Sequence, residues 1–450
     1  MLFLIILALL FGRIYCSFIC PLGTFMSLFP CSISKVSKPA FTKLRWLILA
    51  ITLVLFFSGF TVVLGILDPY SAYGRIAVHV FKPVYLFANN ILASIFNNFG
   101  NYTFYKVEIV MLSVFSFIVA LLTFVAIGVL AWKKGRFYCN TICPVGTIFG
   151  FINKFSLFKI RIDNGKCTSC GICAKKCKAS CIDVKAKTID YSKCVNCFSC
   201  INNCSRKGLS FAMKSKEKEL EKEEKVDKSK RKFVLTSLAT TVAVPAVFAS
   251  HPVPGAISQR GASAQRKIAI SPPGSVSAER LLKHCTSCHL CIAKCPSKVL
   301  KPAFMEYGIG GMMMPMMHFE RGFCNYDCIT CSSVCPNHAL LPLTKKQKHG
   351  LQVGKVIFIP EICVVHTNGT SCGACSEHCP TQAVKMVPYK NGLTIPVIDT
   401  DICVGCGGCE FICPVRPHRA IYIEGNKIHK KAKAFAVEET EEKEITDFGF

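Results

Sequence analysis

Cys285-Thr-Ser-Cys288-His-Leu-Cys291-Ile-Ala-Lys-Cys295-Pro296 begins the stretch that decides the fold of the second half of this 450-residue chain. Its spacing is that of bacterial ferredoxins, in which three close thiolates hold one [4Fe–4S] cluster and a fourth Cys, before Pro, ligates the partner cluster. Three more runs that end in Cys-Pro follow. The four runs are Cys285, Cys288, Cys291 and Cys295; Cys324, Cys328, Cys331 and Cys335; Cys363, Cys372, Cys375 and Cys379; and Cys403, Cys406, Cys409 and Cys413. This density predicts iron–sulfur binding rather than a chance match.

The spacing leaves open which of the four runs share clusters. A nested arrangement would join the first with the fourth and the second with the third, whereas a sequential one would join neighbours. The first run also contains Cys-x2-Cys-His, which is a haem attachment motif. Because Cys291 and Cys295 follow at ferredoxin spacing, the cluster is the favoured interpretation.

A second group of cysteines predicts a two-cluster ferredoxin unit earlier in the chain. Its two runs are Cys167, Cys170, Cys173 and Cys177; and Cys194, Cys197, Cys200 and Cys204. We expect the last Cys of each run to ligate the other run's cluster. No Pro follows Cys177 or Cys204, and Cys181 could replace Cys177 as a ligand. Cys-x2-Cys pairs also hold zinc, but two complete four-ligand runs fit clusters better.

The overall composition excludes two other classes of protein. Cysteine makes up 30 of the 450 residues, and its regular spacing favours clusters over the disulfides of small secreted proteins. The net charge of +27 could indicate nucleic-acid binding. The basic residues instead gather beside apolar stretches, which is typical of the positive-inside rule of membrane proteins. We therefore expect a membrane partner and no nucleic acid.

Two uncharged or nearly uncharged stretches predict transmembrane helices, Trp46–Leu67 and Val107–Trp132. Between them, Val84–Phe99 could form an interfacial or re-entrant helix. Residues 1–11 are apolar but too short to span, so either the helix continues through Cys16 and Cys20 or the true start lies upstream. Neither predicted span contains His, which argues against a haem held by paired histidines in the membrane.

A repeated motif flanks these helices. Gly-Arg-x-Tyr-Cys-x3-Cys-Pro-x-Gly occurs at residues 12–23 and again at residues 135–146. Its cysteines are Cys16 and Cys20 in the first copy and Cys139 and Cys143 in the second. Each pair lies one helical turn apart, so the thiols could bind a metal, form a redox thiol–disulfide pair, or pack. Neither copy alone carries the ligands of a cubane cluster.

Residues 214–232 form a charged linker, and the sequence after it resembles an export signal. Lys230-Arg231-Lys232-Phe233 leads into a mildly apolar run to Ala249, which is similar to a twin-arginine signal with Lys in place of the first Arg. Export would place residues 250–450 outside the cytoplasm and leave residues 133–232 inside. The alternative is a buried or interfacial helix with the C-terminal part still inside. We favour export.

These patterns together predict an α+β multi-domain protein. It would combine a transmembrane α-helical part with ferredoxin-like (βαβ) iron–sulfur modules. The expected domains are a membrane domain, residues 1–150; a two-cluster ferredoxin domain, residues 151–211; a linker with the export-like segment, residues 212–277; a four-cluster ferredoxin domain, residues 278–430; and a charged tail, residues 431–450.

These motifs resemble two known families. Residues 1–210, with the Cys-x3-Cys-Pro repeats, apolar helices and two ferredoxin runs, resemble NapH, the membrane polyferredoxin linked to periplasmic nitrate reductase. Residues 229–450 resemble the NapG/MauM ferredoxin-type proteins, so the chain looks like a fusion. The resemblance implies a quinol dehydrogenase component of the cytoplasmic membrane that passes electrons from the quinone pool to an extracytoplasmic reductase or cytochrome. The Lys-Arg signal, the short first helix and the fusion itself depart from those families.

We therefore expect a multi-pass membrane electron carrier with about six [4Fe–4S] clusters. The alternative from another class is an assembly or maturation factor that uses the Cys-x3-Cys-Pro thiols to reduce a metal or a partner's disulfide. A redox sensor ranks last, because the sequence contains no recognisable output domain. Whether the chain is itself an enzyme, and which molecule is the terminal acceptor, the sequence leaves open.

Overall fold

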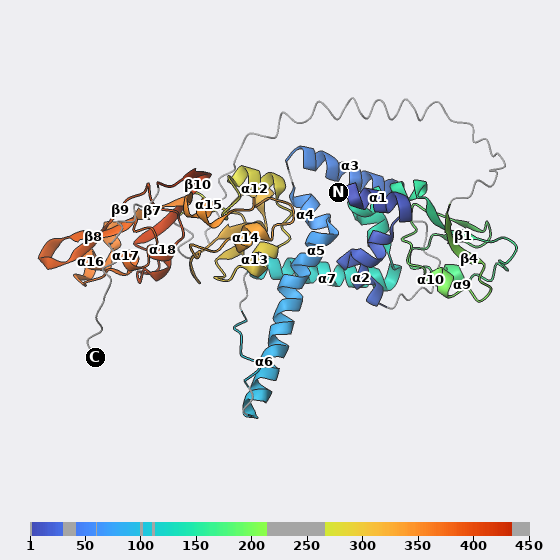
Figure 1. The fold of residues 1–450 in the computed structure, drawn as a ribbon, viewed down its shortest axis with the longest axis horizontal. Coiled ribbons are helices and arrows are strands. Elements are labelled where there is room, and N and C mark those ends of the chain that lie inside the picture. Colours follow the sequence, from blue (N-terminus) through green and yellow to red (C-terminus); the bar gives the residue numbers. More distant parts are fainter. Residues whose placement is uncertain are drawn as a thin grey trace, which may run out of the picture. The chain divides into compact units, whose positions relative to one another are not determined.

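The computed structural model describes residues 2–29, 42–59, 61–99, 102–109, 113–213 and 266–433 (Figure 1). It divides into two compact units. Unit 1 comprises residues 1–255, 282–293 and 302–314, and unit 2 comprises residues 256–281, 294–301 and 315–450. The predictions for the charged linker and the export-like segment, residues 214–249, fall outside the described residues, as does most of the charged tail.

Unit 1 contains a helical part and a small ferredoxin-like module. The helical part consists of α1 (Leu2–Phe11), η1 (Tyr15–Ile19), α2 (Pro21–Leu28), α3 (Thr42–Phe57), α4 (Val62–Leu67), α5 (Pro69–Ile76), η2 (Ala77–Phe81), α6 (Lys82–Asn98), α7 (Val114–Lys134), η3 (Tyr138–Ile142), α8 (Pro144–Ile152) and η4 (Asn153–Phe155). The elements η1, η2 and η3 are π-helical turns. Each π-helical turn inserts extra backbone into a helical run, a feature frequent at functional sites.

The predicted helix Trp46–Leu67 is broken in the structure. Helix α3 ends at Phe57, Gly59 adopts φ +84°, and α4 starts at Val62. Thr61 Oγ1 donates a hydrogen bond to the carbonyl of Leu282 at 2.6 Å. The break lets the chain meet a segment more than 200 residues away, which local hydropathy cannot reveal.

The region predicted as an interfacial helix belongs to a longer helical run. Helix α5, η2 and α6 continue from Pro69 to Asn98, and this run and α7 are both long and apolar enough to cross a membrane. Figure 1 shows α6 running across the direction of α7 rather than along it. The interfacial helix over Val84–Phe99 and the span over Val107–Trp132 stay predictions.

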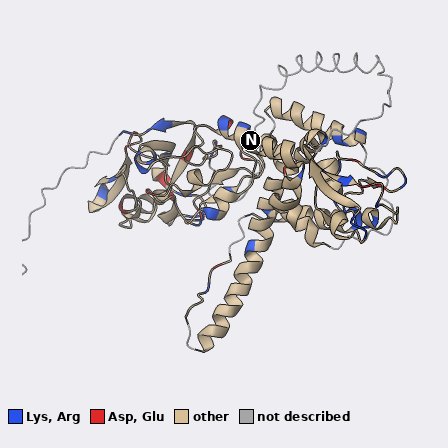
Figure 2. Cartoon of the chain, turned by 45° about the vertical axis from the view of Figure 1, so that its right-hand side comes forward, with Lys and Arg blue, Asp and Glu red and all other residues tan. Residues whose placement is uncertain are grey.

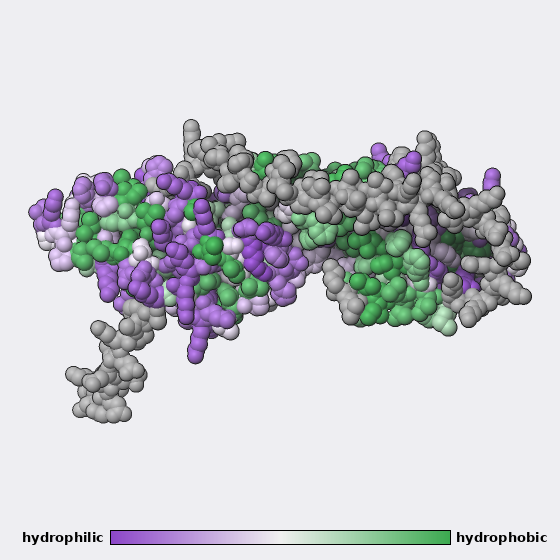
Figure 3. Space-filling view, turned by 90° about the horizontal axis from the view of Figure 1, so that it is seen from above, coloured by the Kyte–Doolittle hydropathy of each residue, from purple (hydrophilic) through white to green (hydrophobic). Residues whose placement is uncertain are grey.

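The helical part of unit 1 exposes many large apolar side chains. Helix α7 exposes Val114, Leu122, Val125 and Trp132, and α6 exposes a comparable set. Figure 2 shows few charged residues on these helices, and Figure 3 shows hydrophobic residues gathered over the helical part. An apolar surface of this kind marks contact with lipid or with another protein.

The ferredoxin-like module of unit 1 is built from paired short strands. Strand β1 (Phe158–Ile162) pairs antiparallel with β4 (Leu209–Met213), and β2 (Ile182–Asp183) pairs with β3 (Thr188–Ile189). The short helices α9 (Ile172–Lys175) and α10 (Ser199–Asn202) each follow a cysteine loop. The strands therefore join the two cysteine runs into one small core.

Unit 2 repeats this plan on a larger scale. Strand β7 (Leu351–Phe358) pairs antiparallel with β10 (Ile421–Lys431), and β8 (Val384–Pro388) pairs with β9 (Thr394–Ile398). The strands β5 (Leu300–Pro302) and β6 (Pro315–Met317) form another pair. The remaining elements from residue 278 onward are α12 (Ala278–His284), α13 (Leu290–Lys294), η6 (Ile309–Gly311), α14 (Thr330–Ser333), α15 (Lys345–His349), η7 (Pro360–Ile362), α16 (Val364–Asn368), α17 (Ala374–Glu377), η8 (Lys390–Gly392) and α18 (Gly408–Ile412).

The buried side chain of His318 makes the stability of unit 2 dependent on pH. Burial, together with the positive charges of Lys301, Arg266 and Arg321, lowers the pKa of His318 from 6.5 to about 3. Below pH 6.5 the unfolded chain binds a proton at this position and the folded chain does not. The free energy of unfolding should therefore fall by about 1.4 kcal/mol per pH unit as the pH drops through this window.

We predict that His318→Gln removes this contribution. The midpoint of anaerobic denaturant unfolding, measured between about pH 6 and about pH 5 with cluster absorbance monitored, should depend less steeply on pH than in the wild-type protein. The exposed His418→Gln is the matched control and should leave the slope unchanged. Equal slopes for wild type and His318→Gln would contradict the prediction.

Candidate iron–sulfur sites

The ferredoxin-like module of unit 1 brings its cysteines into two pockets. The first three cysteines of the first run line one pocket together with the last cysteine of the second run. This pocket contains Cys167, Cys170, Cys173 and Cys204. The structure thus brings together the crossed ligand set that the ferredoxin spacing predicts.

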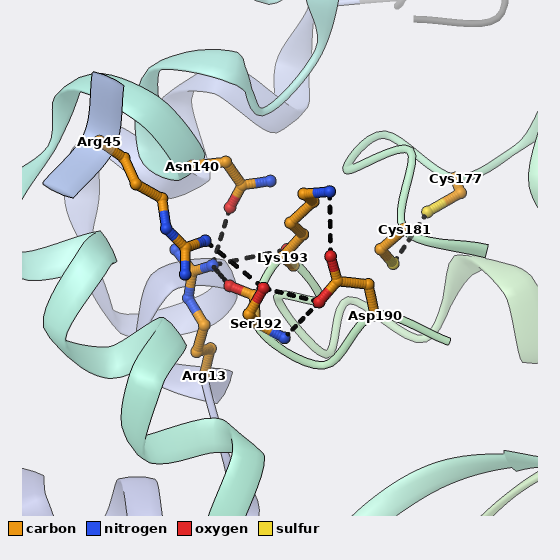
Figure 4. Close-up of polar contacts among 8 residues, drawn as sticks. All are labelled: Arg13, Arg45, Asn140, Cys177, Cys181, Asp190, Ser192 and Lys193. Atoms are coloured by element: carbon orange, nitrogen blue, oxygen red, sulfur yellow. Dashed lines mark hydrogen bonds and ion pairs between the residues drawn. The ribbon is translucent and has the colours of Figure 1, made fainter. Parts of the chain in front are cut away.

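The second pocket of this module holds one thiol more than a [4Fe–4S] cluster needs. It is lined by Cys177, Cys181, Cys194, Cys197 and Cys200. The Sγ atoms of Cys177 and Cys181 lie 3.5 Å apart (Figure 4). The hydrogen bond with Cys181 lowers the pKa of Cys177 to about 6, and the same bond raises the pKa of Cys181. Cys177 is therefore the better thiolate of the two, and Cys181 lies beside it in the same pocket.

Unit 2 shows the same crossing between neighbouring runs. Cys295 lines a pocket with Cys324, Cys328 and Cys331. Cys413 lines a pocket with Cys363, Cys372 and Cys375. Cys403, Cys406 and Cys409 all lie within electrostatic range of Cys379. The structure thus places the first run beside the second and the third beside the fourth, as the sequential arrangement predicts and the nested one does not.

The cysteine loops share a left-handed backbone at the same positions. In each loop with Cys-x2-Cys-x2-Cys spacing, the second residue after the first Cys and the residue after the second Cys have positive φ. These pairs are Ser169 and Gly171, Asn196 and Phe198, Ser287 and His289, and Gly405 and Gly407. Non-glycine residues in this region cost about 1–3 kcal/mol each and persist at functional sites. Loops of this shape direct successive amides inward, which favours a bound anion such as a thiolate-ligated cluster.

Backbone amides also point at the cysteine that ends three of the runs. The amide of Gly208 donates to Cys204 Sγ at 3.3 Å, and that of Ala383 donates to Cys379 Sγ at 3.2 Å. The amide of Leu340 donates to Cys335 Sγ at 3.4 Å. Hydrogen bonds to the sulfur atoms are one of the terms that set cluster potentials.

Burial favours the neutral, protonated form of several cysteines in the runs unless a bound cation stabilises the thiolate. It raises the pKa of Cys331, Cys375 and Cys406 to about 12. Iron would replace the proton at each sulfur and supply the positive charge that the pocket lacks. Among the described residues, no three His, Cys, Asp or Glu side chains converge closely enough for a single metal ion. The donor set, the pocket lining and the inward amides all fit a multi-iron cluster.

The four cysteines of the repeated motif also converge. Cys20 lies within electrostatic range of Cys16 and Cys139, and Cys143 lies within range of all three others. Their exposed fractions are only 4–7 %. The two copies of the motif, far apart in sequence, therefore share one buried site.

The motif's arginines connect the two copies, a role that the sequence pattern did not predict. Arg13 Nη2 donates to the carbonyl of Cys139 at 3.0 Å, and Arg136 Nη1 donates to the carbonyl of Cys16 at 3.1 Å. Each copy of the motif thus reaches across to the other. The signal was visible, because the Arg recurs at the same position in both copies, but only the thiols were assigned a role.

Comparison with known protein families gives three matches, all to iron–sulfur domains. Residues 370–416 match a 4Fe-4S dicluster domain, and residues 190–299 match another 4Fe-4S dicluster domain. Residues 1–29 and 115–163, which contain the repeated motif, match a 4Fe-4S binding domain. The match over 190–299 joins the run Cys194–Cys204 to the run Cys285–Cys295. In the structure, Cys204 instead shares a pocket with Cys167, Cys170 and Cys173, and Cys295 shares one with Cys324, Cys328 and Cys331.

Several ferredoxin-type proteins are related to parts of this chain. The ferredoxin-type protein NapF of Escherichia coli is 28% identical over 157 residues, covering 35% of this chain and 87% of that protein. The methylamine utilization ferredoxin-type protein MauM of Methylobacillus flagellatus is 27% identical over 194 residues, covering 42% and 81%. The ferredoxin-type protein NapG of E. coli is 24% identical over 154 residues, covering 32% and 66%.

These findings confirm the iron–sulfur part of the prediction. The chain is an iron–sulfur, ferredoxin-type electron-transfer protein related to the Nap and Mau ferredoxins. The NapH-like interpretation of residues 1–210 stays a prediction, as do the individual ligand assignments.

We predict that Cys181 can substitute for Cys177. In Cys177→Ala the iron content should stay near the wild-type value, because Cys181 lines the same pocket. In Cys177→Ala/Cys181→Ala it should fall by about four iron atoms per chain, the content of one [4Fe–4S] cluster. Iron and acid-labile sulfide analysis of the anaerobically purified protein makes the measurement.

Cys173→Ala is the matched control, since its pocket contains four cysteines and no spare. It should lose iron as a single variant. The prediction fails if Cys177→Ala alone loses as much iron as the double variant.

Proposed function

We propose that this chain is a membrane-bound polyferredoxin that moves electrons between the quinone pool and an extracytoplasmic redox partner. It would carry about six [4Fe–4S] clusters, two on the cytoplasmic side and four outside. Each cluster takes up and releases one electron at a time, and the protein sets its potential through hydrogen bonds and burial. The partner would be a reductase or a cytochrome.

The observation that carries this proposal is what α7 contacts at its two ends. Just after its last residue, the amide of Arg136 donates to the carbonyl of Lys178 in the first ferredoxin-like module, at 2.9 Å. At its first turn, Phe115 stacks edge-on against Phe304, which follows the run Cys285–Cys295. The 21 residues of α7 measure about 30 Å, the thickness of a bilayer's apolar core. This supports placing the two groups of clusters on opposite faces of the membrane.

The charge pattern supports the same orientation. Lys133 and Lys134 occupy the last turn of α7, on the side of the first ferredoxin-like module. Lys and Arg concentrate on the cytoplasmic side of membrane helices. The module at residues 158–213 would then be cytoplasmic and the runs from Cys285 onward extracytoplasmic.

The burial of the Cys-x3-Cys-Pro thiols weighs against the maturation-factor alternative. A thiol that reduces a partner's disulfide must reach that disulfide. None of Cys16, Cys20, Cys139 and Cys143 is more than 7 % exposed. An internal electron-transfer role suits these thiols better.

Quinol oxidation by the purified protein tests the proposal. We expect a reduced menaquinol analogue, added anaerobically to the protein in detergent, to reduce part of the clusters as seen by EPR. The oxidised analogue is the matched control and should reduce none. If dithionite reduces the clusters but the quinol leaves them oxidised, electrons do not enter this chain from quinol and the quinone link is wrong.

A further inference from the structure

The shared thiol site has the same geometry in both copies of the motif. A Cβ at Gly23 would lie 2.1 Å from the carbonyl oxygen of Cys16 and 3.1 Å from Arg136 Nη1. A Cβ at Gly146 would lie 2.1 Å from that of Cys139 and 3.1 Å from Arg13 Nη2. Any side chain at either glycine would collide with the carbonyl of the Cys loop and crowd the Arg of the other copy, so only Gly fits here. The motif encodes one two-fold site from two halves.

The charges around this site call for an anion. Arg13 and Arg136 are 0 % and 2 % exposed, and within the residues that the structure describes neither forms an ion pair with a carboxylate. A buried charge without a counter-charge is strongly unfavourable. Both guanidinium groups lie within electrostatic range of Cys139. Four thiolates around an iron–sulfur core carry a net negative charge, which these two cations would balance.

The ends of two helices point at the same sulfurs. Cys20 and Cys143 are the N-cap residues of α2 and α8, each followed by Pro. The amide of Gly146 donates to Cys143 Sγ at 3.2 Å. Free amides and the positive end of the helix dipole stabilise a thiolate at this position.

One side of the thiol site contacts the second cysteine run of the first ferredoxin-like module. Cys16 shares a small core with Val195, against which Cys197 packs. Ser17 Oγ donates to the carbonyl of Val195 at 2.5 Å. Figure 4 shows Arg13, whose Nη1 donates to the carbonyl of Ser192 at 3.2 Å. The loop that would hold the cluster at Cys194–Cys200 therefore rests on the thiol site.

Helix α5 separates the other side of the thiol site from the loop Cys285–Cys291. Cys20, Cys139 and Cys143 form one core with Ala72 and Ile76 of α5. On the same helix a Cβ at Gly74 would lie 2.5 Å from the carbonyl oxygen of Cys288. Only the width of one helix, about 10 Å with its side chains, stands between the two sites.

The contact between α5–η2 and this loop is specific and buried. Arg75 Nη1 lies 3.5 Å from the carbonyl oxygen of Ser287. His79 Nε2 lies 2.8 Å from His289 Nδ1, and His289 Nε2 lies 2.8 Å from the carbonyl oxygen of Met313. A carbonyl accepts only from N–H, so His289 carries its proton on Nε2 and its Nδ1 accepts from His79. These polar contacts fix the position of the loop relative to the helix.

We propose that Cys16, Cys20, Cys139 and Cys143 together hold an iron–sulfur cluster that relays electrons through the helical part of the chain. The cluster at Cys194, Cys197 and Cys200 lies on one side of this site, and the cluster at Cys285, Cys288 and Cys291 lies on the other. Each transfer oxidises one cluster by one electron and reduces its neighbour by one, and no bond forms or breaks. The relay rests on the proposed topology, whereas the binding of iron by these four thiols does not.

Iron content tests the site itself. Relative to wild type, Cys20→Ala/Cys143→Ala should lose about two or about four iron atoms per chain, since four Cys ligands hold either a [2Fe–2S] or a [4Fe–4S] cluster. One Mössbauer or EPR component should disappear with them. Met26→Leu is the matched control, because Met26 Sδ contacts Cys139 Sγ at 3.8 Å without being one of the four thiols. The site is overturned if the double variant purifies with unchanged iron and spectra, or if wild type holds zinc or a disulfide there.

Electron distribution in vesicles tests the relay. The wild-type protein is reconstituted without quinone, and a reductant that cannot cross the membrane is added outside. We expect EPR to show both groups of clusters reduced in wild type and in Met26→Leu. In Cys20→Ala/Cys143→Ala, reduction of the far group should be lost while the near group is still reduced.

The possible outcomes separate the relay from the proposed function. If the far group in wild type stays oxidised until a menaquinone analogue is added, the relay is overturned and the quinone link stands. If the double variant transfers electrons across the membrane as fast as wild type, the relay is likewise overturned.

Discussion

The crossing of the last cysteine of one run into the pocket of another is the constraint on which both ferredoxin-like parts depend. Cys295 and Cys413 each join a pocket formed by a different run. The sheets around these pockets are only two-stranded, and an isolated two-stranded hairpin is marginally stable at best. Cluster binding would therefore supply folding free energy, as metal binding does in small metallo-domains. The left-handed residues recur at matching positions in these loops, and a bound cluster would compensate for their conformational cost.

In the helical part the equivalent constraint is a reciprocal contact between the two copies of one motif. Arg13 and Arg136 each donate one hydrogen bond to a cysteine carbonyl of the other copy. The glycines permit this approach, and the thiols converge as a result. Because the cysteine loops at Ser192–Val195 and Thr286–His289 contact this helical part directly, its geometry also fixes where their clusters would lie. The proposed relay would use this fixed geometry and would need no freely diffusing carrier between the clusters.

The local chemistry was readable from the sequence, but the long-range pairing was not. Three thiolates from one loop follow from spacing alone, so each run could be recognised. Whether Cys295 meets Cys324 depends on how strands separated by loops come together, and the spacing left two arrangements open. The break in the predicted helix Trp46–Leu67 was equally hidden, because it is made by Thr61 and Gly65 against residues 282–286. The repetition of the motif indicated a function for its cysteines, but that the two copies form one site could be seen only in the structure.

The central claim is that the two groups of clusters lie on opposite sides of a membrane. Labelling oriented vesicles with an amine reagent that cannot cross the membrane, followed by peptide mass spectrometry, tests it most directly. Exposed lysines report each side: Lys166 and Lys185 for the first ferredoxin-like module, and Lys346 and Lys390 for unit 2. The account predicts that vesicles of one orientation label one pair and vesicles of the other orientation label the second pair. Labelling of both pairs from the same side would contradict it.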